Sequence, residues 1–219
     1  MIAVLTGDLV NSSKMLNEIH TDAITTIQGL LQSINEQHGA TGEIYRGDEF
    51  QIQFPNAIHA ITCTILIKLA LHFKTRSDKP VLCTLSLAYG EQPLSGKQPT
   101  ISTGPVFIES GRGLANTPRG EISVSFGHNN TSEMRLLTQF LSHQLNKLTK
   151  TQAELLYIYI TNHFAEHQKI AEITKTSRQN ISNRLSSIGA TLIRDYIAVI
   201  NQRVTKAKGK DDGLTTTVN

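Results

Sequence analysis

The sequence feature that most constrains the fold is residues 43–54, which read EIYRGDEFQIQF. Residues 50–54 alternate phenylalanine or isoleucine with glutamine, which is typical of a strand with one buried face. Residues 43–45 can form a second short strand, and the intervening Arg-Gly-Asp-Glu is typical of a tight turn. The pattern therefore predicts a hairpin, with Asp48 and Glu49 at its tip.

Adjacent carboxylates at a hairpin tip suit a divalent cation, because hard cations prefer oxygen ligands. A second acidic strand end lies near the start of the chain, where the apolar run of residues 2–6 stops at Gly7-Asp8. If the two strands are neighbours, their acidic ends converge. We therefore predict that Asp8, Asp48 and Glu49 bind Mg²⁺. In the alternative interpretation, Asp8 caps a turn or helix and the other two lie in a solvated turn.

Length and composition predict a globular cytoplasmic protein. A chain of 219 residues with 39% hydrophobic content has one or two domains and enough apolar surface for a core. Its two cysteines, Cys63 and Cys83, lie in apolar runs and are expected to be reduced core residues. We find no apolar run of the roughly 18 residues that a membrane span needs, and no leader peptide, so no membrane partner is predicted.

Charge divides the chain into an acidic and a basic part. Residues 1–127 contain 9 Lys/Arg and 11 Asp/Glu, whereas the rest contains 12 and 7, for net charges of −2 and +5. The acidic part is suited to bind metals and the basic part to bind anions.

The first 127 residues are predicted to form an α/β fold. Helical periodicity or helix signals occur at residues 17–36, 57–73 and 105–114, and further strands are expected at 81–88 and 122–126. With the first strand and the hairpin, the order is βαββαβαβ. This order predicts an α+β sandwich of the palm or ferredoxin-like kind, with helices on a mostly antiparallel sheet.

Three short motifs carry a family resemblance over residues 1–127. The opening VLTGDLVNSSK and the later YRGDEFQ resemble the SatD family of bacterial proteins, and they are similar to class III nucleotide cyclases and GGDEF domains. The resemblance implies a palm-type fold whose acidic residues hold divalent cations, and Asp8 and Asp48 match the ligand positions. The run GPVFIESGR, residues 104–112, is similar to a cyclase helix with Asn and Arg four residues apart. Arg112 matches that Arg, so Arg112 and Arg46 are the predicted nucleotide contacts.

Three positions depart from those families. Ile108 stands where cyclases have the Asn that orients the ribose, Ile44 stands where a Lys reads adenine, and Arg46 replaces the first glycine of GGDEF. These departures favour nucleotide binding without cyclisation, and no catalytic residue is predicted.

After residue 127 the chain is predicted to be all-helical. A polar link at residues 128–131 precedes a helix with apolar positions Met134, Leu137, Phe140, Leu141 and Leu145. Residues 168–188 resemble the helix-turn-helix of many bacterial transcriptional regulators, with the second helix capped by Ser177. The side chains predicted to contact DNA are Lys175, Ser177, Arg178, Gln179, Ser182, Asn183 and Arg184. A small helical dimerisation module is the alternative interpretation.

The last predicted helix, residues 190–204, is expected to pair two copies of the chain. Its apolar positions, Leu192, Ile193, Tyr196, Ile197 and Ile200, would form the contact of a homodimer. Residues 205–219 lack apolar periodicity and are expected to be a disordered tail.

The resulting hypothesis is a regulator with two domains. A palm-like domain at residues 1–127 senses a nucleotide with Mg²⁺, and a helix-turn-helix domain at residues 128–204 binds DNA. One alternative is a divergent nucleotidyl cyclase or nucleotidyltransferase that uses two Mg²⁺ ions. Another is a DNA-binding protein whose palm domain serves only for dimerisation or docking.

Overall fold

The computed structural model describes residues 1–45, 47–91 and 104–211, without the side chains of residues 128 and 208–211. The strands are β1 (Ile2–Leu9), β2 (Thr41–Tyr45), β3 (Glu49–Phe54), β4 (Cys83–Gly90) and β5 (Ile122–Ser125). The helices are α1 (Asn17–His38), α2 (Ala60–Lys74), α3 (Pro105–Asn116), α4 (Ser132–Asn146), α5 (Lys150–Thr161), α6 (His167–Ile173), α7 (Arg178–Ser187) and α8 (Ala190–Asp211). Short 3₁₀ helices, η1 (Ser12–Lys14), η2 (Ala57–His59) and η3 (Gly127–Asn129), complete the order.

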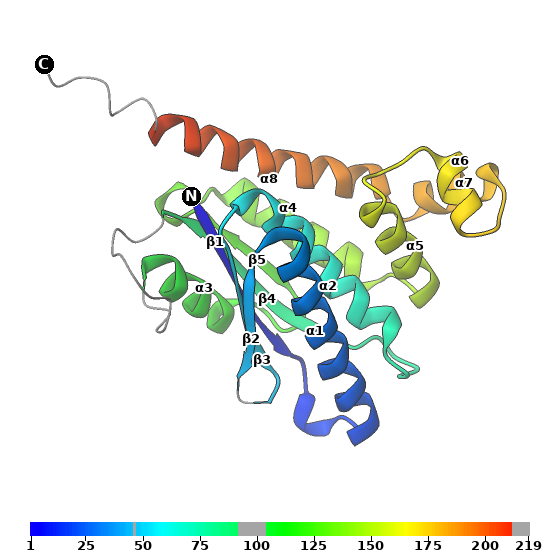
Figure 1. The fold of residues 1–219 in the computed structure, drawn as a ribbon, viewed down its shortest axis with the longest axis horizontal. Coiled ribbons are helices and arrows are strands. Elements are labelled where there is room, and N and C mark those ends of the chain that lie inside the picture. Colours follow the sequence, from blue (N-terminus) through cyan, green and yellow to red (C-terminus); the bar gives the residue numbers. More distant parts are fainter. Residues whose placement is uncertain (46, 92–103, 212–219) are drawn as a thin grey trace, which may run out of the picture.

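The strands form one five-stranded sheet in the order β2-β3-β1-β4-β5 (Figure 1). The pairs β2–β3, β3–β1 and β1–β4 are antiparallel, and β4–β5 is parallel. The predicted mixed α/β fold with a mostly antiparallel sheet is therefore confirmed, whereas its assignment to the palm type stays a prediction.

One face of the sheet packs against α1 and α2. Ala23, Ile27, Leu30 and Ile34 recur on one side of α1 and are buried. Gly39 ends this helix in the left-handed conformation, at φ 63°, and its N–H donates to the Asn35 carbonyl. The strand residues on this face include the buried phenylalanines of β3, as the alternation in the sequence predicts.

The helix over Ala57–Lys74, which combines η2 and α2, differs from our expectation about membrane-spanning segments. Its 18 residues have a mean hydropathy of 1.4, so by length and composition it could cross a membrane. Within the protein, however, 67% of it is buried, as in the central helix of a folded core. Cys63 on this helix and Cys83 on β4 are buried and free, as predicted.

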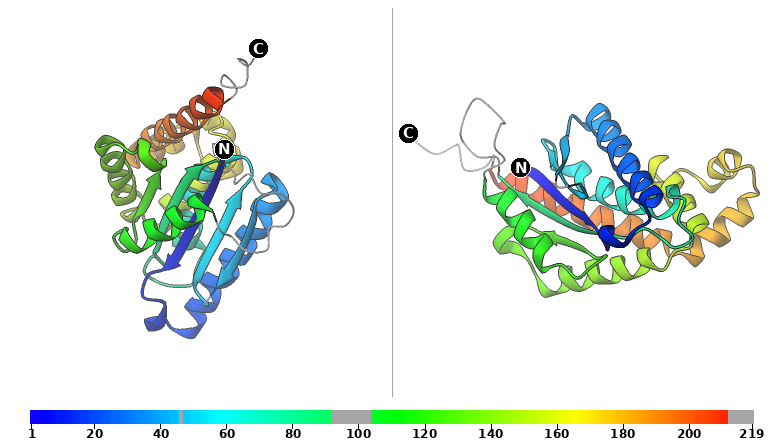
Figure 2. Two further views of the ribbon diagram at one scale, coloured as in Figure 1. Left: turned by 90° about the vertical axis from the view of Figure 1, so that its left-hand side faces the viewer. Right: turned by 90° about the horizontal axis from the view of Figure 1, so that it is seen from below.

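The opposite face of the sheet packs against α3 (Figure 2). Ile2, Val4 and Ala88 from the two central strands form a small apolar cluster with Val106 of α3. Beyond this cluster the same face becomes polar toward the end of β1, where Asp8 lies. The α3 face is therefore polar at the Asp8 end of the sheet, whereas the opposite face packs against the main core.

Helices α4 to α8 pack onto the same body. The Ser142 hydroxyl accepts a hydrogen bond from the Ile122 N–H of β5 at 2.9 Å, and Lys150 Nζ donates to the Thr75 carbonyl at 2.8 Å. One cluster of buried apolar residues extends from Ala3 of β1 to Val204 of α8. The two parts of the chain thus share a core, and a domain boundary at residue 127 stays a prediction.

Helix α8 requires two corrections. Ile193, Tyr196, Ile197 and Ile200 are buried against the chain itself, so they do not form the exposed pairing face that the sequence suggested. The apolar period was correctly identified, but α4 and the rest of the core cover it. The helix also continues to Asp211, so residues 205–211 of the expected disordered tail are helical, and residues 212–219 lie outside the described residues.

Candidate functional site at the acidic end of the sheet

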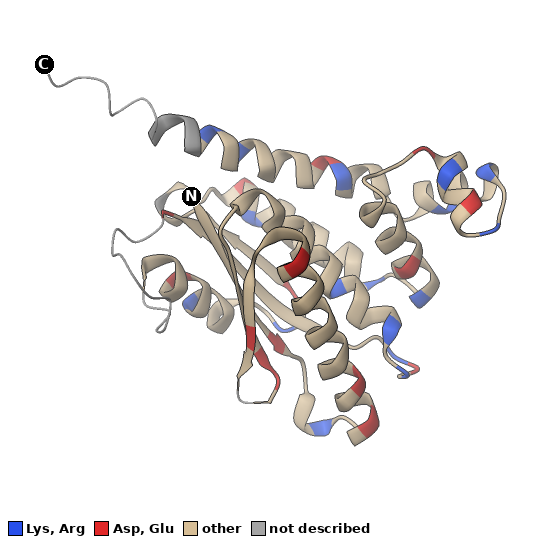
Figure 3. Ribbon diagram, viewed as in Figure 1, with Lys and Arg blue, Asp and Glu red and all other residues tan. Residues whose placement is uncertain are grey.

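The structure places the three predicted metal ligands, Asp8, Asp48 and Glu49, at one end of the sheet. Asp8 of β1 lies directly opposite Glu49 of β3 in the antiparallel register and opposite Thr84 of β4 on its other side. Because directly opposed residues project from the same face, the two carboxylates share one face of the sheet. Asp48 precedes Glu49 in the turn, and the Ser12 hydroxyl donates a hydrogen bond to its carboxylate. Figure 3 shows acidic residues gathered at this end of the sheet.

The charge of this cluster is only partly compensated. Partial burial raises the pKa of Asp8 above 3.8, and the carboxylates of Asp48 and Glu49 raise it further. Arg119 and a hydrogen bond with the backbone of Leu9 act in the opposite direction without cancelling the rise. A bound cation would relieve this repulsion, because it favours the ionised form of each carboxylate.

The three carboxylates do not by themselves form a metal site, so their assignment as Mg²⁺ ligands stays a prediction. Within the described part of the chain, no group of three or more His, Cys, Asp or Glu residues has the geometry to hold a metal ion. Mg²⁺ is commonly held by one or two carboxylates, with phosphate oxygens and water as its other ligands. Asp8 with Glu49 or Asp48 can supply such a pair, and the hydroxyls of Ser12 and Thr84 are close by in the structure.

A line of hydrogen bonds crosses the same face of the sheet. The Tyr45 hydroxyl donates to the Gln51 side chain at 3.2 Å, and the Gln51 amide donates to the Thr6 hydroxyl at 3.1 Å. Thr6 and Ser110 of α3 share a hydrogen bond of 2.7 Å between their hydroxyls, and Ser110 donates to the Ser86 carbonyl at 2.9 Å. The network links α3 and β2 to β1, next to the acidic end of the sheet.

The positively charged side chain that lowers the pKa of Asp8 is Arg119, which the sequence analysis did not identify. Arg119 is exposed in the loop between α3 and β5. The first paired residue of β5 lies beside Leu85, next to the Thr84 that faces Asp8. Only the parallel pairing of β4 with β5 brings this loop to the acidic end, and no sequence motif marks it.

Only one of the two predicted nucleotide contacts, Arg112, lies among the residues that the structure describes. Arg112 is exposed on α3, and its guanidinium makes no ion pair or hydrogen bond with the residues that the structure describes. Arg46 lies outside the described residues. Neither position is tested as a nucleotide contact, and both stay predictions.

The positions that depart from the cyclase motifs also differ in environment. Ile44 is half-buried and packs against the main core, on the side of the sheet away from Asp8. Ile108 is 53% exposed on α3. The side chain of Ile44 therefore points away from the acidic cluster.

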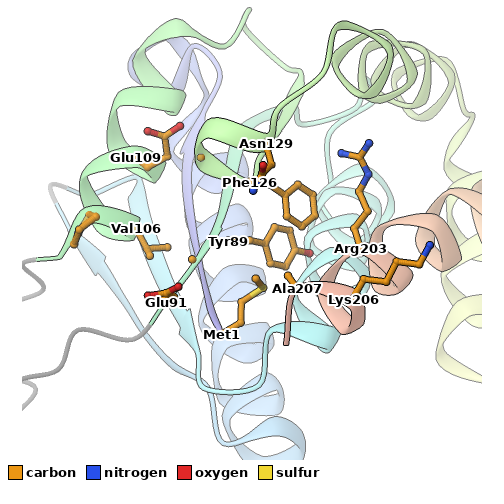
Figure 4. A pocket seen from close by; sticks show the side chains of 13 residues that line it. Met1, Tyr89, Glu91, Val106, Glu109, Phe126, Asn129, Arg203, Lys206 and Ala207 are labelled. Carbon is orange, nitrogen blue, oxygen red and sulfur yellow. The ribbon is translucent and has the colours of Figure 1, made fainter. Parts of the chain in front are cut away.

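A pocket of about 950 Å³ lies at the other end of the sheet (Figure 4). The rings of Tyr89 and Phe126 stack there with centroids 4.6 Å apart, and the Arg203 guanidinium lies 5.9 Å from the Phe126 centroid. Gly90, which lines this pocket, pairs with Ile2 at the opposite end of β1 from Asp8. The pocket is therefore separate from Asp8, Asp48 and Glu49.

The residues predicted to contact DNA lie on and before α7. Lys175 adopts the left-handed conformation, at φ 53°, in the turn after α6, and the Ser177 hydroxyl caps α7 by accepting from the Asn180 N–H. Both residues are exposed, as are Arg178, Gln179 and Asn183. Ser182 is half-exposed, and Gln179 donates to Asn183 at 3.1 Å.

Arg184 has a different environment. Its guanidinium donates to the Thr151 carbonyl at the start of α5, at 3.1 Å. This contact ties α7 to the body of the protein, and Arg184 is less available to phosphates than the exposed residues of the first turn.

No family model matches the sequence, and no curated protein matches it, so the SatD and helix-turn-helix resemblances stay predictions. Among solved structures, the guanylyl cyclase Cya2 is 20% identical, with a TM-score of 0.43 over 57% of this chain and 74% of that one. The guanylate cyclase domain of RhGC from Catenaria anguillulae in complex with GTP is 15% identical, with a TM-score of 0.43 over 57% and 77%. The adenylyl cyclase CyaB from P. aeruginosa is 14% identical, with a TM-score of 0.44 over 57% and 76%. Likenesses this low establish no shared activity.

Proposed function

We propose that the acidic end of the sheet binds the phosphates of a nucleotide through a divalent cation, in a divergent relative of the nucleotide cyclases. The observation that carries this proposal is the opposition of Asp8 and Glu49 in the strand register, with Asp48 in the adjoining turn. Carboxylates that repel one another at a partly buried strand end destabilise the fold unless a ligand uses them. Mg²⁺ with a polyphosphate supplies the missing positive charge and the remaining oxygen ligands.

Each residue of the site has a distinct role in this proposal. Asp8 and one of its two acidic neighbours hold the cation. Arg119 is placed to contact a phosphate oxygen, because it already acts on Asp8 from the side of β5. Gln51 and Thr6 hold the strand ends in position through their hydrogen bond.

The proposal is for binding, with catalysis as a separate alternative. A nucleotidyl cyclase or transferase would use two Mg²⁺ ions at an α-phosphate. Ile44 and Ile108 stand at two positions where active cyclases carry polar side chains, and Ile44 packs into the core. Nucleotide binding without cyclisation is therefore the expected behaviour, and incubation with ATP or GTP and Mg²⁺ should yield no cyclic product.

A thermal-shift titration of the full chain tests the proposal. Nucleoside triphosphates are added with and without Mg²⁺ to the natural protein, to Asp8→Asn and Asp48→Asn, and to Asp78→Asn as a control. Asp78 is an exposed carboxylate in the segment between α2 and β4, and it was not predicted as a ligand. A ligand at 100 times its dissociation constant adds about 2.7 kcal/mol, which is several degrees for a domain of this size.

The expected result is a Mg²⁺-dependent shift that Asp8→Asn and Asp48→Asn abolish and that Asp78→Asn retains. Absence of a shift with every nucleotide would overturn the proposal. A shift of equal size in all four proteins would place the nucleotide elsewhere, for example in the pocket beside Tyr89.

A second candidate function is DNA binding by α7. The observation that favours it is the exposed cluster at the start of that helix, where Arg178, Gln179 and Asn183 lie free of the core. Such side chains suit base edges, and Lys175 before the helix suits a phosphate. In Figure 1, α6 and α7 lie at one extremity of the molecule, far from β1.

Mobility-shift assays at several salt concentrations test this candidate. Lys175→Ala should weaken binding of all sequences and reduce the salt dependence, whereas Gln179→Ala should relax sequence preference. Thr191→Ala, an exposed substitution on α8, is the control. If DNA binding is absent, or unchanged in Arg178→Ala and Lys175→Ala, α7 does not serve as a recognition helix.

A further inference from the structure

Helix α4 carries an exposed apolar patch. Leu136, Leu137 and Phe140 are 53%, 49% and 64% exposed, although the periodicity of the sequence grouped two of them with the core. The buried side of the same helix is formed by Met134, Leu141 and Leu145, together with two small hydroxyl residues. Large apolar side chains that cluster on a surface mark a site of association more often than isolated ones.

Helix α8 contacts the side of α4 that carries Thr138. The Gln144 amide of α4 donates to the Ile188 carbonyl at 3.1 Å, and the hydroxyls of Thr138 and Tyr196 share a hydrogen bond of 2.6 Å. The two helices therefore lie side by side and antiparallel. Leu192 of α8 is also exposed, at 74%.

Charges at the two ends of α4 are arranged symmetrically about Phe140. Residues seven apart lie on nearly the same line of a helix, because seven residues make almost two full turns. Glu133 is seven residues before Phe140, Lys147 is seven after it, and all three are exposed. The exposed line thus has an acid at one end, a base at the other and an aromatic ring midway.

We propose that α4 pairs with α4 of a second copy of this chain, antiparallel and about a two-fold axis at Phe140. In this arrangement, a residue that lies n positions before Phe140 in one copy faces the residue n positions after Phe140 in the other copy. Glu133 then faces Lys147 of the second copy, and the contact occurs twice. Leu136 and Leu137 of each copy then lie opposite Gln144 and His143 of the other copy, on either side of the two Phe140 rings.

Self-complementarity is the reason for choosing a second copy as the occupant. An isologous interface requires one surface to match itself after a two-fold rotation. The line from Glu133 to Lys147 meets this requirement in charge, and Phe140 on the axis faces itself. This pairing uses α4 rather than the buried face of α8, and it is independent of the acidic site on the sheet.

Sedimentation velocity of the full chain over a wide concentration range is the first test. The expected mass at high concentration is twice the 24.1 kDa of one chain. Phe140→Asp should leave a monomer at every concentration, because it places a charge on the axis. A natural protein that is monomeric throughout, or a dimer that persists in Phe140→Asp, would overturn the proposal.

Charge reversal tests the register. Glu133→Lys alone places a new lysine of one copy opposite Lys147 of the other, and Lys147→Glu alone places two glutamates opposite each other. Each variant should therefore self-associate roughly tenfold more weakly. An equimolar mixture of the two variants restores both opposite-charge contacts. The two variants should therefore dimerise more strongly when mixed than either variant does alone.

Arg135→Glu is the matched control, since it reverses an exposed charge on the same helix away from the Phe140 line. It should leave the dimer unchanged. Both reversals on the line also oppose the helix dipole, so thermal unfolding of each variant is followed in parallel. Rescue by mixing separates pairing from stability, because two weakened monomers gain nothing from mixing unless they contact each other. Absence of rescue would rule out this register.

Discussion

The ring of Phe50 occupies the space that a side chain at Gly7 would fill. A Cβ atom at position 7 would lie 2.3 Å from Cζ of Phe50 and 2.8 Å from a methyl group of Leu85. Phe50 is fully buried, and the residue after Gly7 is Asp8. The glycine therefore lets the aromatic core pack directly beneath the strand end that carries the acidic site.

Gly7→Ala is expected to destabilise the protein by about 1–3 kcal/mol, the usual range for overpacking a core. The added methyl group must displace Phe50 or bend β1, and either change moves Asp8 relative to Glu49. Urea unfolding measures the stability, and the nucleotide thermal shift reports the site. The matched control is Gly29→Ala on the exposed side of α1, where a Cβ meets nothing within 4 Å. That substitution should stabilise the helix by about 0.5–1 kcal/mol. Equal effects at the two positions would contradict the packing argument.

Asp8→Asn is expected to raise the free energy of unfolding at neutral pH. The folded-state pKa of Asp8 lies above 3.8, so the ionised carboxylate destabilises the folded protein at pH 7. As the pH falls through the folded pKa toward 3.8, the folded protein takes up this proton first and the destabilisation disappears. The gain from Asp8→Asn should therefore be full at pH 7 and vanish below 3.8. Urea unfolding over this range measures it, and a loss of stability at pH 7 would indicate a structural role for the carboxylate.

Lys68→Met is expected to flatten the alkaline stability profile. Lys68 is buried, and its Nζ donates to the carbonyls of Gly120 at 2.6 Å and Cys83 at 3.3 Å. Burial lowers the pKa of Lys68 below 10.5, so between the folded and unfolded pKa values the unfolded chain binds more protons. Stability contributed by this group therefore rises with pH in that window. The measurement is the difference between the two proteins in chemical denaturation from neutral to alkaline pH, and a constant difference would contradict the shift.

Arg76→Ala is expected to raise the pKa of Asp22 toward its ordinary value, although the backbone N–H at position 76 remains. The Arg76 guanidinium donates two hydrogen bonds to the Asp22 carboxylate, at 2.8 and 2.7 Å, and its backbone N–H donates a third. These contacts lower the pKa of Asp22 from 3.8 to about 2. Any stability from this pair is present above 3.8 and is lost as the pH falls through about 2. An NMR titration of the carboxylate measures both values. Lys79→Ala, at a nearby exposed position, should leave the pKa of Asp22 unchanged.

The sequence determined the elements of this protein and their local signals. Alternation in residues 50–54 correctly predicted which side chains of β3 are buried, because a strand places successive residues on opposite faces. Thr131, Thr149 and Ser177 begin α4, α5 and α7 as capping residues, since a cap depends only on backbone groups two or three residues away. The sequence predicted that Asp8 and the acidic hairpin converge only if their strands are neighbours, and the pairing of β1 with β3 meets that condition.

Only the tertiary structure decided what covers each apolar face and what reaches the acidic site. The periodicity of α4 and α8 is alike, yet α8 buries Ile197 whereas α4 exposes Phe140. A periodic pattern shows that a helix has an apolar side, but the packing partner comes from elements distant in the chain. Arg119 reaches the neighbourhood of Asp8 for a similar reason, through the parallel pairing of β5 with β4. Contacts of this kind depend on how the whole chain closes on its core, and no local segment of sequence encodes them.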